Sequence, residues 1–441
     1  GQLLGFVCNI AHHADIGGMS PGSMAGGMKD IYQEGLRIPV VKLFRKGKLD
    51  QDIFDILLLN VRVREERRGD YNAQFSALHL AARRLFEMIN KYSGDVIRNV
   101  FNEIIDRTYE RMLSAITLIP DGVYRFEDVM DDDGREAVNV PINLTATIKG
   151  KSALFDFAGT SPQTPGNINI PLHGTKAAVC YVLKAMLDPE IPNNQGVLDA
   201  VEVVAPMGTM VSCIAPASVA ARAHTSQRIV DVVIGALSSA LPEAAVGAAN
   251  GANTMAVFAG NDPETGEPYV YLETLGGGFG GRNDRDGKDG VQVHITNTSN
   301  LPIEAIEMEY PLRVDRYGFI PDSGGAGKYR GGLGLQRVVR PIGHTCIFNG
   351  VGERFRNSPW GIFDGCSGQS GSFWLEEDQC LPIQLSHKPP DMPLKPNQAL
   401  VVNTPGAGGY GDPKKRSKEL IKSDKVSGKF SDKFLRKFYK N

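Results

Sequence analysis

The pattern of the chain changes from helical to strand-like within residues 120–157, which read PDGVYRFEDVMDDDGREAVNVPINLTATIKGKSALFDF. Pro120-Asp121-Gly122 and Asp131-Asp132-Asp133-Gly134 are turn signals, because Pro, Asp and Gly favour the backbone conformations of tight turns. From Val138 to Phe157 apolar and polar residues alternate as in a half-buried strand. This stretch predicts that strands dominate the rest of the chain.

Helical spacing precedes this stretch. Over residues 74–117 apolar residues recur every three or four positions, as at Leu78, Ala82 and Leu85, which predicts amphipathic helices with a break near Ser93-Gly94. The helical pattern returns over 174–187 and 226–241, and from Gly276 short apolar segments bounded by Gly or Pro predict sheets joined by tight loops. We expect an α+β fold, namely a β-rich chain with an N-terminal helical region and mixed sheets.

Composition sets broad limits on function. The chain has 441 residues, 42% of them hydrophobic and 22% charged, which is typical of a globular protein of two or three domains. A net charge of −2 favours neither nucleic acid nor a membrane surface as the main partner. The six cysteines show no C-x-x-C spacing, and the first residues lack the features of a signal peptide. We therefore expect a reducing, cytoplasmic location.

Four regions are expected along the chain. Residues 1–120 would hold a strand with a metal motif, a loop and amphipathic helices; 121–275 an α+β region on the substrate side; 276–413 a β-rich region with Gly loops; and 414–441 a basic tail. The start without Met, inside a strand pattern, leads us to expect a natural N-terminus further upstream. The tail holds eleven Lys and Arg against three Asp and Glu, which favours a solvated tail or a docked terminal helix over nucleic-acid binding. We expect the tail to matter for assembly rather than for chemistry.

The densest polar group is Ala11-His12-His13-Ala14-Asp15-Ile16-Gly17-Gly18. The apolar run before it, from Leu3 to Ala11, predicts a strand, in which His12 and His13 would point to opposite faces, so that one ring can bind an ion while the other supports it. Imidazole favours Zn²⁺ or Mn²⁺ over Ca²⁺ or Mg²⁺. The group falls short of the three protein ligands of a typical catalytic site. Ordinary polar histidines at a strand end are the alternative.

Three other groups carry possible chemistry. The residues from Asp156 to Asn169, including Asn167, suit either a polar substrate loop or a run of Asx and Ser/Thr turns. Arg222 precedes a predicted helix with Thr225 or Ser226 as its N-cap, where either an oxyanion is bound or the cap is plain and the arginine solvated. The run Gly276–Gly281 is followed by Arg282, with Asp284, Asp286, Asp289 and His294 nearby, and such glycine runs can bind phosphate. The chain has no G-x-x-x-x-G-K-[ST] loop and no G-x-S-x-G elbow, so another chain would have to bind any ATP.

Taken together, blocks along nearly the whole chain resemble the hydantoinase B/oxoprolinase family. These blocks are 11–18, 20–24, 31–39, 60–62, 69–70, 157–169, Asn297-Thr298 with Glu304, 322–327 and 404–411. Family members are ATP-dependent enzymes that open hydantoin, 5-oxoproline or related lactam rings and, more distantly, ketone carboxylases.

The resemblance implies a subunit of an ATP-dependent cyclic-amide hydrolase, in a hetero-oligomer with a hydantoinase A-type ATP-binding subunit. ATP would phosphorylate the amide oxygen, and water activated by a divalent metal, Zn or Mn, would attack the lactam carbon. Only His12 matches one of the family's metal ligands; the upstream acidic residue and the Gly-Gly-Thr-His-type motif have no counterpart in this sequence. With this resemblance, the candidate catalytic residues are His13, Asp15, Asn167 and Arg222. A ketone carboxylase subunit and a non-catalytic scaffold subunit are the alternatives.

Overall fold

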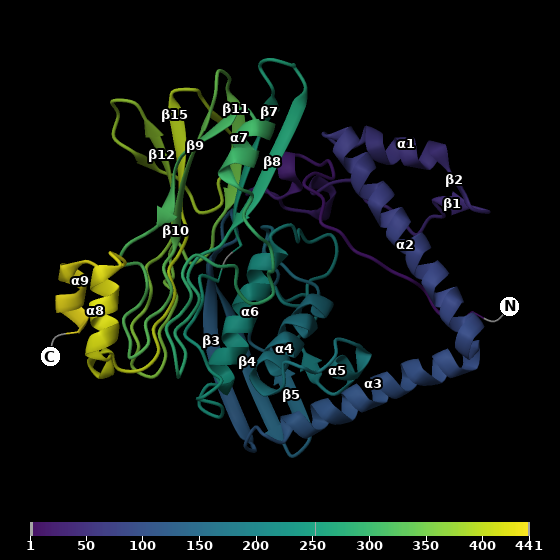
Figure 1. Cartoon of the computed structure of the whole chain (residues 1–441), viewed down its shortest axis with the longest axis horizontal. Coiled ribbons are helices and arrows are strands. Elements are labelled where there is room, and N and C mark those ends of the chain that lie inside the picture. The colour runs from purple at the N-terminus through teal and green to yellow at the C-terminus, as the bar shows by residue number, and fades with distance from the viewer. Residues whose placement is uncertain (1–2, 252, 440–441) are drawn as a thin grey trace.

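The computed structural model describes residues 3–251 and 253–439 and confirms the α+β class (Figure 1). Three helices near the N-terminus form an arm that extends away from the sheets. Ser93 separates the second helix from the third and accepts a hydrogen bond from the Val96 N–H, so the break falls where the sequence predicts it. The elements of this region are η1 (Pro21–Ser23), η2 (Ile31–Gln33), β1 (Phe44–Arg45), β2 (Lys48–Leu49), α1 (Gln51–Leu59), α2 (Arg64–Tyr92) and α3 (Gly94–Ile116).

A four-stranded sheet follows the arm. Its strands are β3 (Gly122–Asp132), β4 (Val138–Lys149), β5 (Ser152–Asp156) and β6 (Glu202–Val204), in that order, with β6 parallel to β5 and the other pairs antiparallel. Every second residue of β4 from Val140 to Ile148 is buried, as the alternation predicts. These side chains share one core with the helices α4 (Leu172–Leu187), α5 (Gln195–Asp199) and α6 (Arg222–Leu237). From His224 onward, α6 is buried along its whole length.

Two further sheets enclose a second core. One has the order β14-β11-β7-β8 and the other β13-β12-β15-β10-β9, and all their pairs are antiparallel. Phe258, Phe348 and Phe373 are among the rings that fill the space between them. The elements are β7 (Thr254–Asn261), β8 (Pro268–Leu275), α7 (Ile303–Glu309), β9 (Leu312–Phe319), β10 (Leu335–Pro341), β11 (Cys346–Val351), β12 (Ser372–Glu377), β13 (Ile383–Gln384), β14 (Met392–Leu394) and β15 (Gln398–Asn403).

Glycine-rich segments form a layer of closely packed backbone. In Figure 1 they appear as long traces that run side by side between β3 and the C-terminal helices. The Gly281 N–H donates to the Gly408 carbonyl (2.9 Å), and the Gly408 N–H donates to the Ala248 carbonyl (2.8 Å). A Cβ on Gly280 would lie 1.9 Å from the Gly247 carbonyl oxygen. The glycines after Gly276 thus let backbone pack directly on backbone, because any side chain would separate the segments.

The basic tail is folded against this layer. It contains η3 (Pro413–Lys415), α8 (Lys418–Val426) and α9 (Asp432–Phe438). Phe430, Leu435 and Tyr439 pack on Ala326 and Leu333 of the glycine-rich segments. Of the two structures expected for the tail, the docked terminal helix is the one observed.

Two local predictions are wrong. Residues 3–13 form no strand, and Phe6 and Ile10 are 84% and 94% exposed, because no other described segment pairs with this run. Helix α6 begins at Arg222, so Thr225 lies inside the helix and donates its hydroxyl to the Ile168 carbonyl instead of capping. Among the described residues, no helix is both long enough and apolar enough to cross a bilayer.

Candidate functional site

The N-terminal loop, residues 12–35, brings His12 close to Arg222. His12 is exposed, but partial burial of its ring lowers its pKa, and the positive charge of Arg222 and the neighbouring His13 lower the pKa further. Arg222 is exposed on the first turn of α6, with a weak hydrogen bond to the Val219 carbonyl (3.4 Å). Two predicted site residues 210 positions apart are therefore near enough for the Arg222 charge to act on the His12 ring, and the lowered pKa favours the neutral form of that ring.

His13 is held by the arm rather than by the loop. Its Nδ1 lies 3.3 Å from Asp70 Oδ2, and its ring contacts the Tyr71 ring with 5.1 Å between centroids. Asp70 also pairs with Arg67 (2.8 Å). His13 thus fixes the start of the loop to α2, which is consistent with a supporting role beside His12.

Asp15 is fully buried and organises the loop. Its carboxylate accepts hydrogen bonds from the N–H groups of Gly17 (2.8 Å), Gly22 (3.2 Å) and Arg62 (3.2 Å), and from Arg62 Nη1 (2.8 Å). Gly17 has a φ of +85°, and a Cβ there would lie 2.3 Å from the Asn60 carbonyl oxygen. The Asp15 carboxylate therefore already accepts four hydrogen bonds. Gly17 lets the loop pack directly against the backbone of Asn60 rather than against a ligand.

Asn167 links the loop to the start of α6. Its side-chain Nδ2 donates to the Ala25 carbonyl (2.9 Å), and its backbone carbonyl accepts from the Ala221 N–H (2.9 Å). Its side-chain oxygen is buried without a hydrogen-bond partner among the described residues. An unsatisfied buried amide oxygen is costly. Asn167 therefore holds Arg222 in place and keeps one acceptor unused.

Glu34 is a further anchor that the sequence analysis did not single out. One of its carboxylate oxygens accepts hydrogen bonds from Ser218 Oγ and from the N–H groups of Val219 and Ala220. These contacts pin the loop to the residues just before α6. The signal available in the sequence was the position of Glu34 inside the block 31–39.

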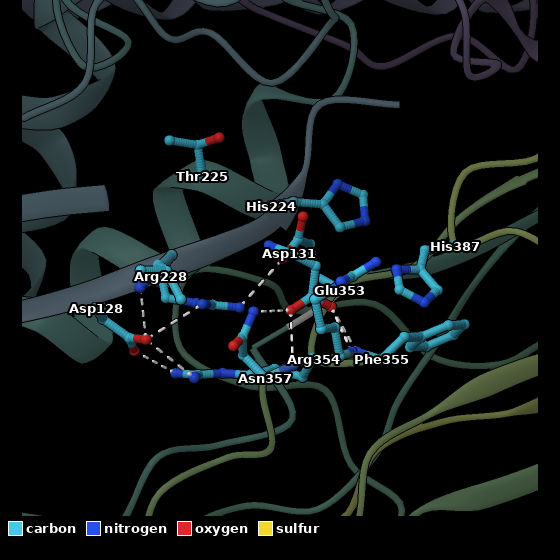
Figure 2. Close-up of polar contacts among 12 residues, drawn as sticks. Asp128, Asp131, His224, Thr225, Arg228, Glu353, Arg354, Phe355, Asn357 and His387 are labelled. Carbon is cyan, nitrogen blue, oxygen red and sulfur yellow. Dashed lines mark hydrogen bonds and ion pairs between the residues drawn. The ribbon is translucent and has the colours of Figure 1, made fainter. Parts of the chain in front are cut away.

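A buried ionic cluster lies along α6 and was also missed (Figure 2). Arg354 Nη2 bonds Asp128 Oδ2 and Asp231 Oδ2, each over 2.7 Å. Arg228 Nη1 reaches Asp128 over 3.4 Å, and Trp360 Nε1 donates to the same carboxylate (2.9 Å). These contacts tie β3 and the loop after β11 to the middle of α6.

Glu353 extends the cluster on the other side. It pairs with Lys388 Nζ (2.6 Å) and with Arg228 Nη2 (3.2 Å). Lys388 also contacts Asp132 (3.3 Å), which accepts a hydrogen bond from His387 Nδ1 (2.8 Å). Glu353, Arg228 and Lys388 have no exposed side-chain surface, whereas Asp132 and His387 lie at the edge of the cluster and are partly exposed.

Asp131 closes the cluster through backbone donors. It accepts from the N–H groups of Phe355 (2.6 Å), Arg356 (3.0 Å) and Asn357 (2.9 Å), and from Asn357 Nδ2 (2.8 Å). Burial acts to raise its pKa, but the Arg228 charge and these donors outweigh burial, so the pKa falls below its usual value.

The electrostatics of the cluster are those of a structural core. Burial acts to raise the pKa of Asp128, but Arg354 and Arg228 hold it well below its usual range. Burial raises the pKa of Glu353 despite Lys388. Burial lowers the pKa of His224, in the first turn of α6, to about 4. The cluster fixes the position of α6 relative to β3 and the loop after β11, and α6 in turn positions Arg222.

The described residues do not complete a metal site. No group of three or more His, Cys, Asp and Glu side chains within 3–251 and 253–439 is placed to hold an ion together. His12 offers one neutral imidazole, while Asp15 is occupied by its four donors. A catalytic metal usually has three protein ligands, so the donor set present here does not fit a complete site.

Comparison with known proteins gives a consistent result. The model of the family described as Hydantoinase B/oxoprolinase matches residues 1–413. The putative B-type subunit of a D-/L-hydantoinase from a Pseudomonas strain is 33% identical over 440 residues, covering 97% of this chain and 74% of that protein. The crystal structure of the ATP-dependent caprolactamase from Pseudomonas jessenii superposes with a TM-score of 0.89 at 27% identity, covering 96% of this chain and 74% of that one. A nucleotide-free acetone carboxylase structure shares the fold, with a TM-score of 0.89 at 17% identity over 97% of this chain and 63% of that one.

Proposed function

The chain belongs to the hydantoinase B/oxoprolinase family, and from this premise we propose that it is one subunit of an ATP-dependent hydrolase that opens a cyclic amide. The observation that carries the proposal is that Arg222, at the start of α6, lies near enough to His12 for its charge to lower the pKa of the imidazole. A neutral imidazole beside a guanidinium provides a proton acceptor next to a group that binds anions. Hydrolysis of an ATP-activated amide needs both functions.

The proposed chemistry divides between two chains. An amide resists water because resonance stabilises it, so ATP at an A-type partner subunit first phosphorylates the amide oxygen. Water then adds to the ring carbon of this phosphorylated intermediate, the ring nitrogen takes a proton, and the C–N bond breaks to give an acyl phosphate. A second water hydrolyses the acyl phosphate to the free carboxylate and inorganic phosphate. Arg222 would bind the phosphoryl oxygens, and His12 would orient the water or accept its proton. The same pair suits a hydantoin, 5-oxoproline or another lactam.

A divalent metal, Zn or Mn, remains part of the proposal only through His12. The described residues do not form a complete ion site, and no step above depends on an ion. As the alternative to proton transfer, we propose His12 as one ligand of this ion, with the other ligands supplied from outside the described residues, because the ring nitrogen that binds an ion cannot also accept a proton.

The arm supports the proposal of a hetero-oligomer. Among the 29 residues of α2 only Arg67 is buried, whereas helices in proteins gain most of their stability from packing of an apolar face. Leu80, Phe86 and Met88 are 47%, 65% and 43% exposed. We propose that the A-type subunit covers part of the exposed surface of α2, including Phe86. The six cysteines carry free thiols, which suits the cytoplasmic location proposed here.

The deciding experiment uses the chain co-purified with its A-type partner. ATP hydrolysis is measured with a panel of hydantoins and lactams, and separately with ketone plus bicarbonate. Lactam-dependent turnover that falls at least about 100-fold in Arg222→Gln, but not in the control Arg313→Gln, which changes an exposed arginine on β9, supports the proposal. Turnover that requires ketone and bicarbonate would make the complex a carboxylase. Absence of turnover with every substrate would favour a scaffold subunit.

The interface is tested separately. Phe86→Asp should weaken co-purification with the partner, because a charge would have to be buried in the contact. Leu381→Asp changes a side chain that is 89% exposed elsewhere and serves as the control. Equal recovery of partner with Phe86→Asp and wild type would place the interface on another face.

A further inference from the structure

A small cavity lies between α4, the C-terminal half of α6 and the first glycine-rich segment. Its volume is about 260 Å³, and its apolar wall includes Val182, Met186, Ile234 and Phe279. The polar groups that line it are Tyr181, Arg282 and His294. Small-molecule sites have this composition, a mostly apolar wall with a few placed polar groups.

Arg282 provides a cation that no described carboxylate neutralises by direct contact. Its guanidinium lies over the Phe279 ring, 4.9 Å from the centroid, and its Nε is buried without a hydrogen-bond partner among the described residues. The nearest acidic residue in sequence, Asp284, is bound instead by Arg285, with two contacts of 3.0 Å from Nε. Arginine stays protonated even when it is partly buried. The Arg282 guanidinium is therefore a positive charge in the cavity wall that is available to bind an anion.

His294 is fixed in the wall by the buried cluster. Its Nε2 lies 3.2 Å from Asp231 Oδ1, and the other oxygen of Asp231 is bound by Arg354 (2.7 Å). The ring is 2% exposed, and the backbone at His294 has a φ of +50°, a conformation that few residues other than glycine adopt. Strain of this kind often accompanies functional sites. The bond to Asp231 leaves Nδ1 as the remaining polar atom of the ring.

We propose that this cavity binds a small organic carboxylate, with its carboxylate on Arg282 and Tyr181 and its apolar part against Val182, Met186 and Ile234. Arginine suits this role because its planar fork matches both oxygens of a carboxylate. The Tyr181 hydroxyl makes no hydrogen bond to any described residue and is available as a second donor. At about 1.5 Å of rise per residue, Ile234 lies about 18 Å along α6 from Arg222, so an occupied cavity would contact the same helix that positions Arg222.

The test measures binding of valerate to the full chain by ligand-observed NMR, with valeramide as the uncharged analogue. Valerate should bind, valeramide should bind at least about 10-fold more weakly, and Arg282→Gln should lower valerate affinity by a similar factor, since a charge-assisted contact is lost. Arg313→Gln alters an exposed arginine on β9 that does not line the cavity and should leave affinity within about 2-fold.

Two variants keep the test decisive if Arg282→Gln does not fold. Arg282→Lys retains the charge but not the two-pronged geometry, and Tyr181→Phe removes only the hydroxyl; each should weaken valerate binding at least about 3-fold. Equal binding of valerate and valeramide, unchanged affinity in Arg282→Lys and Tyr181→Phe, or no binding of valerate at millimolar concentration would each overturn the proposal. None of these results bears on lactam hydrolysis, so this inference and the proposed function fail independently.

Discussion

Arg354 and Asp128 form a buried ion pair of 2.7 Å between residues 226 positions apart, and the same guanidinium also bonds Asp231 on α6. One side chain thereby joins β3, α6 and the loop after β11. Removing a partner from a buried pair is costly because the remaining charge is left uncompensated in the core.

Arg354→Ala should therefore lower the free energy of unfolding by about 3–5 kcal/mol. Arg356→Ala is the control, because Arg356 lies two positions away and is exposed. Urea unfolding monitored by circular dichroism measures both. A loss below about 1 kcal/mol in Arg354→Ala would show that the cluster contributes little to stability.

Stability should depend on pH through Asp128. Its pKa in the folded protein is depressed, because Arg354 and Arg228 outweigh the effect of burial, while in the unfolded chain it is about 3.9. The ionised form is thus favoured by folding, so its stabilisation is fully present above the unfolded pKa and is lost as pH falls towards the folded pKa. Unfolding measured from pH 7 to pH 3 should show this decline, and Asp128→Asn should flatten it. An equal slope in Asp128→Asn would assign the acid sensitivity to other carboxylates.

Close backbone packing makes the glycine layer intolerant of side chains. In Gly280→Ala the new Cβ would meet the Gly247 carbonyl oxygen at 1.9 Å, so backbone must shift, at a cost of about 1–3 kcal/mol or more. Gly318→Ala on β9 is the control, because no atom lies within 4 Å of a Cβ there. Melting temperatures compare the two variants. Equal values would mean that the glycine segments adjust freely.

How much the sequence predicts depends on whether the signal is local. The alternation of β4 and the helix break at Ser93 follow from neighbouring residues, and both predictions are confirmed. The strand expected from Leu3 to Ala11 is wrong because a strand also needs a partner, which no described segment provides.

The same reasoning applies to the candidate site. The motif around His12 is conspicuous in the sequence, and the structure brings it near Arg222. The ionic cluster has no sequence signature, since Asp128 and Glu353 are ordinary charged residues until folding buries them together. The glycine run at 276–281 has the composition of a loop, and only the neighbouring segments show that it serves packing.

The folded tail should contribute to stability without taking part in turnover. Arg416 Nη2 bonds Asp424 (2.7 Å), and Asp424 also accepts from Arg330 Nε of the body (3.1 Å). Truncation after Pro413 removes these contacts and exposes Leu333, so the free energy of unfolding should fall by about 3 kcal/mol, whereas Lys433→Ala should have no effect. Turnover per assembled complex should stay the same. Loss of turnover in a fully assembled truncated complex would give the tail a role in chemistry.

His12 and His13 should differ sharply when each is replaced. His13 is bound to Asp70 and packs on Tyr71, while His12 faces solvent beside Arg222 with a lowered pKa. In the complete complex, His12→Ala should remove metal and lactam-dependent ATP hydrolysis together, because His12 is the proposed ligand among the described residues and a site that loses a ligand usually loses its ion. His13→Ala should lower activity only about 10- to 100-fold, as for a group that supports a ligand.

His173→Ala, on the exposed start of α4, is the control. Metal content measured beside turnover decides between the roles: if His12→Ala keeps both at wild-type levels, His12 is an ordinary surface residue and the site lies elsewhere.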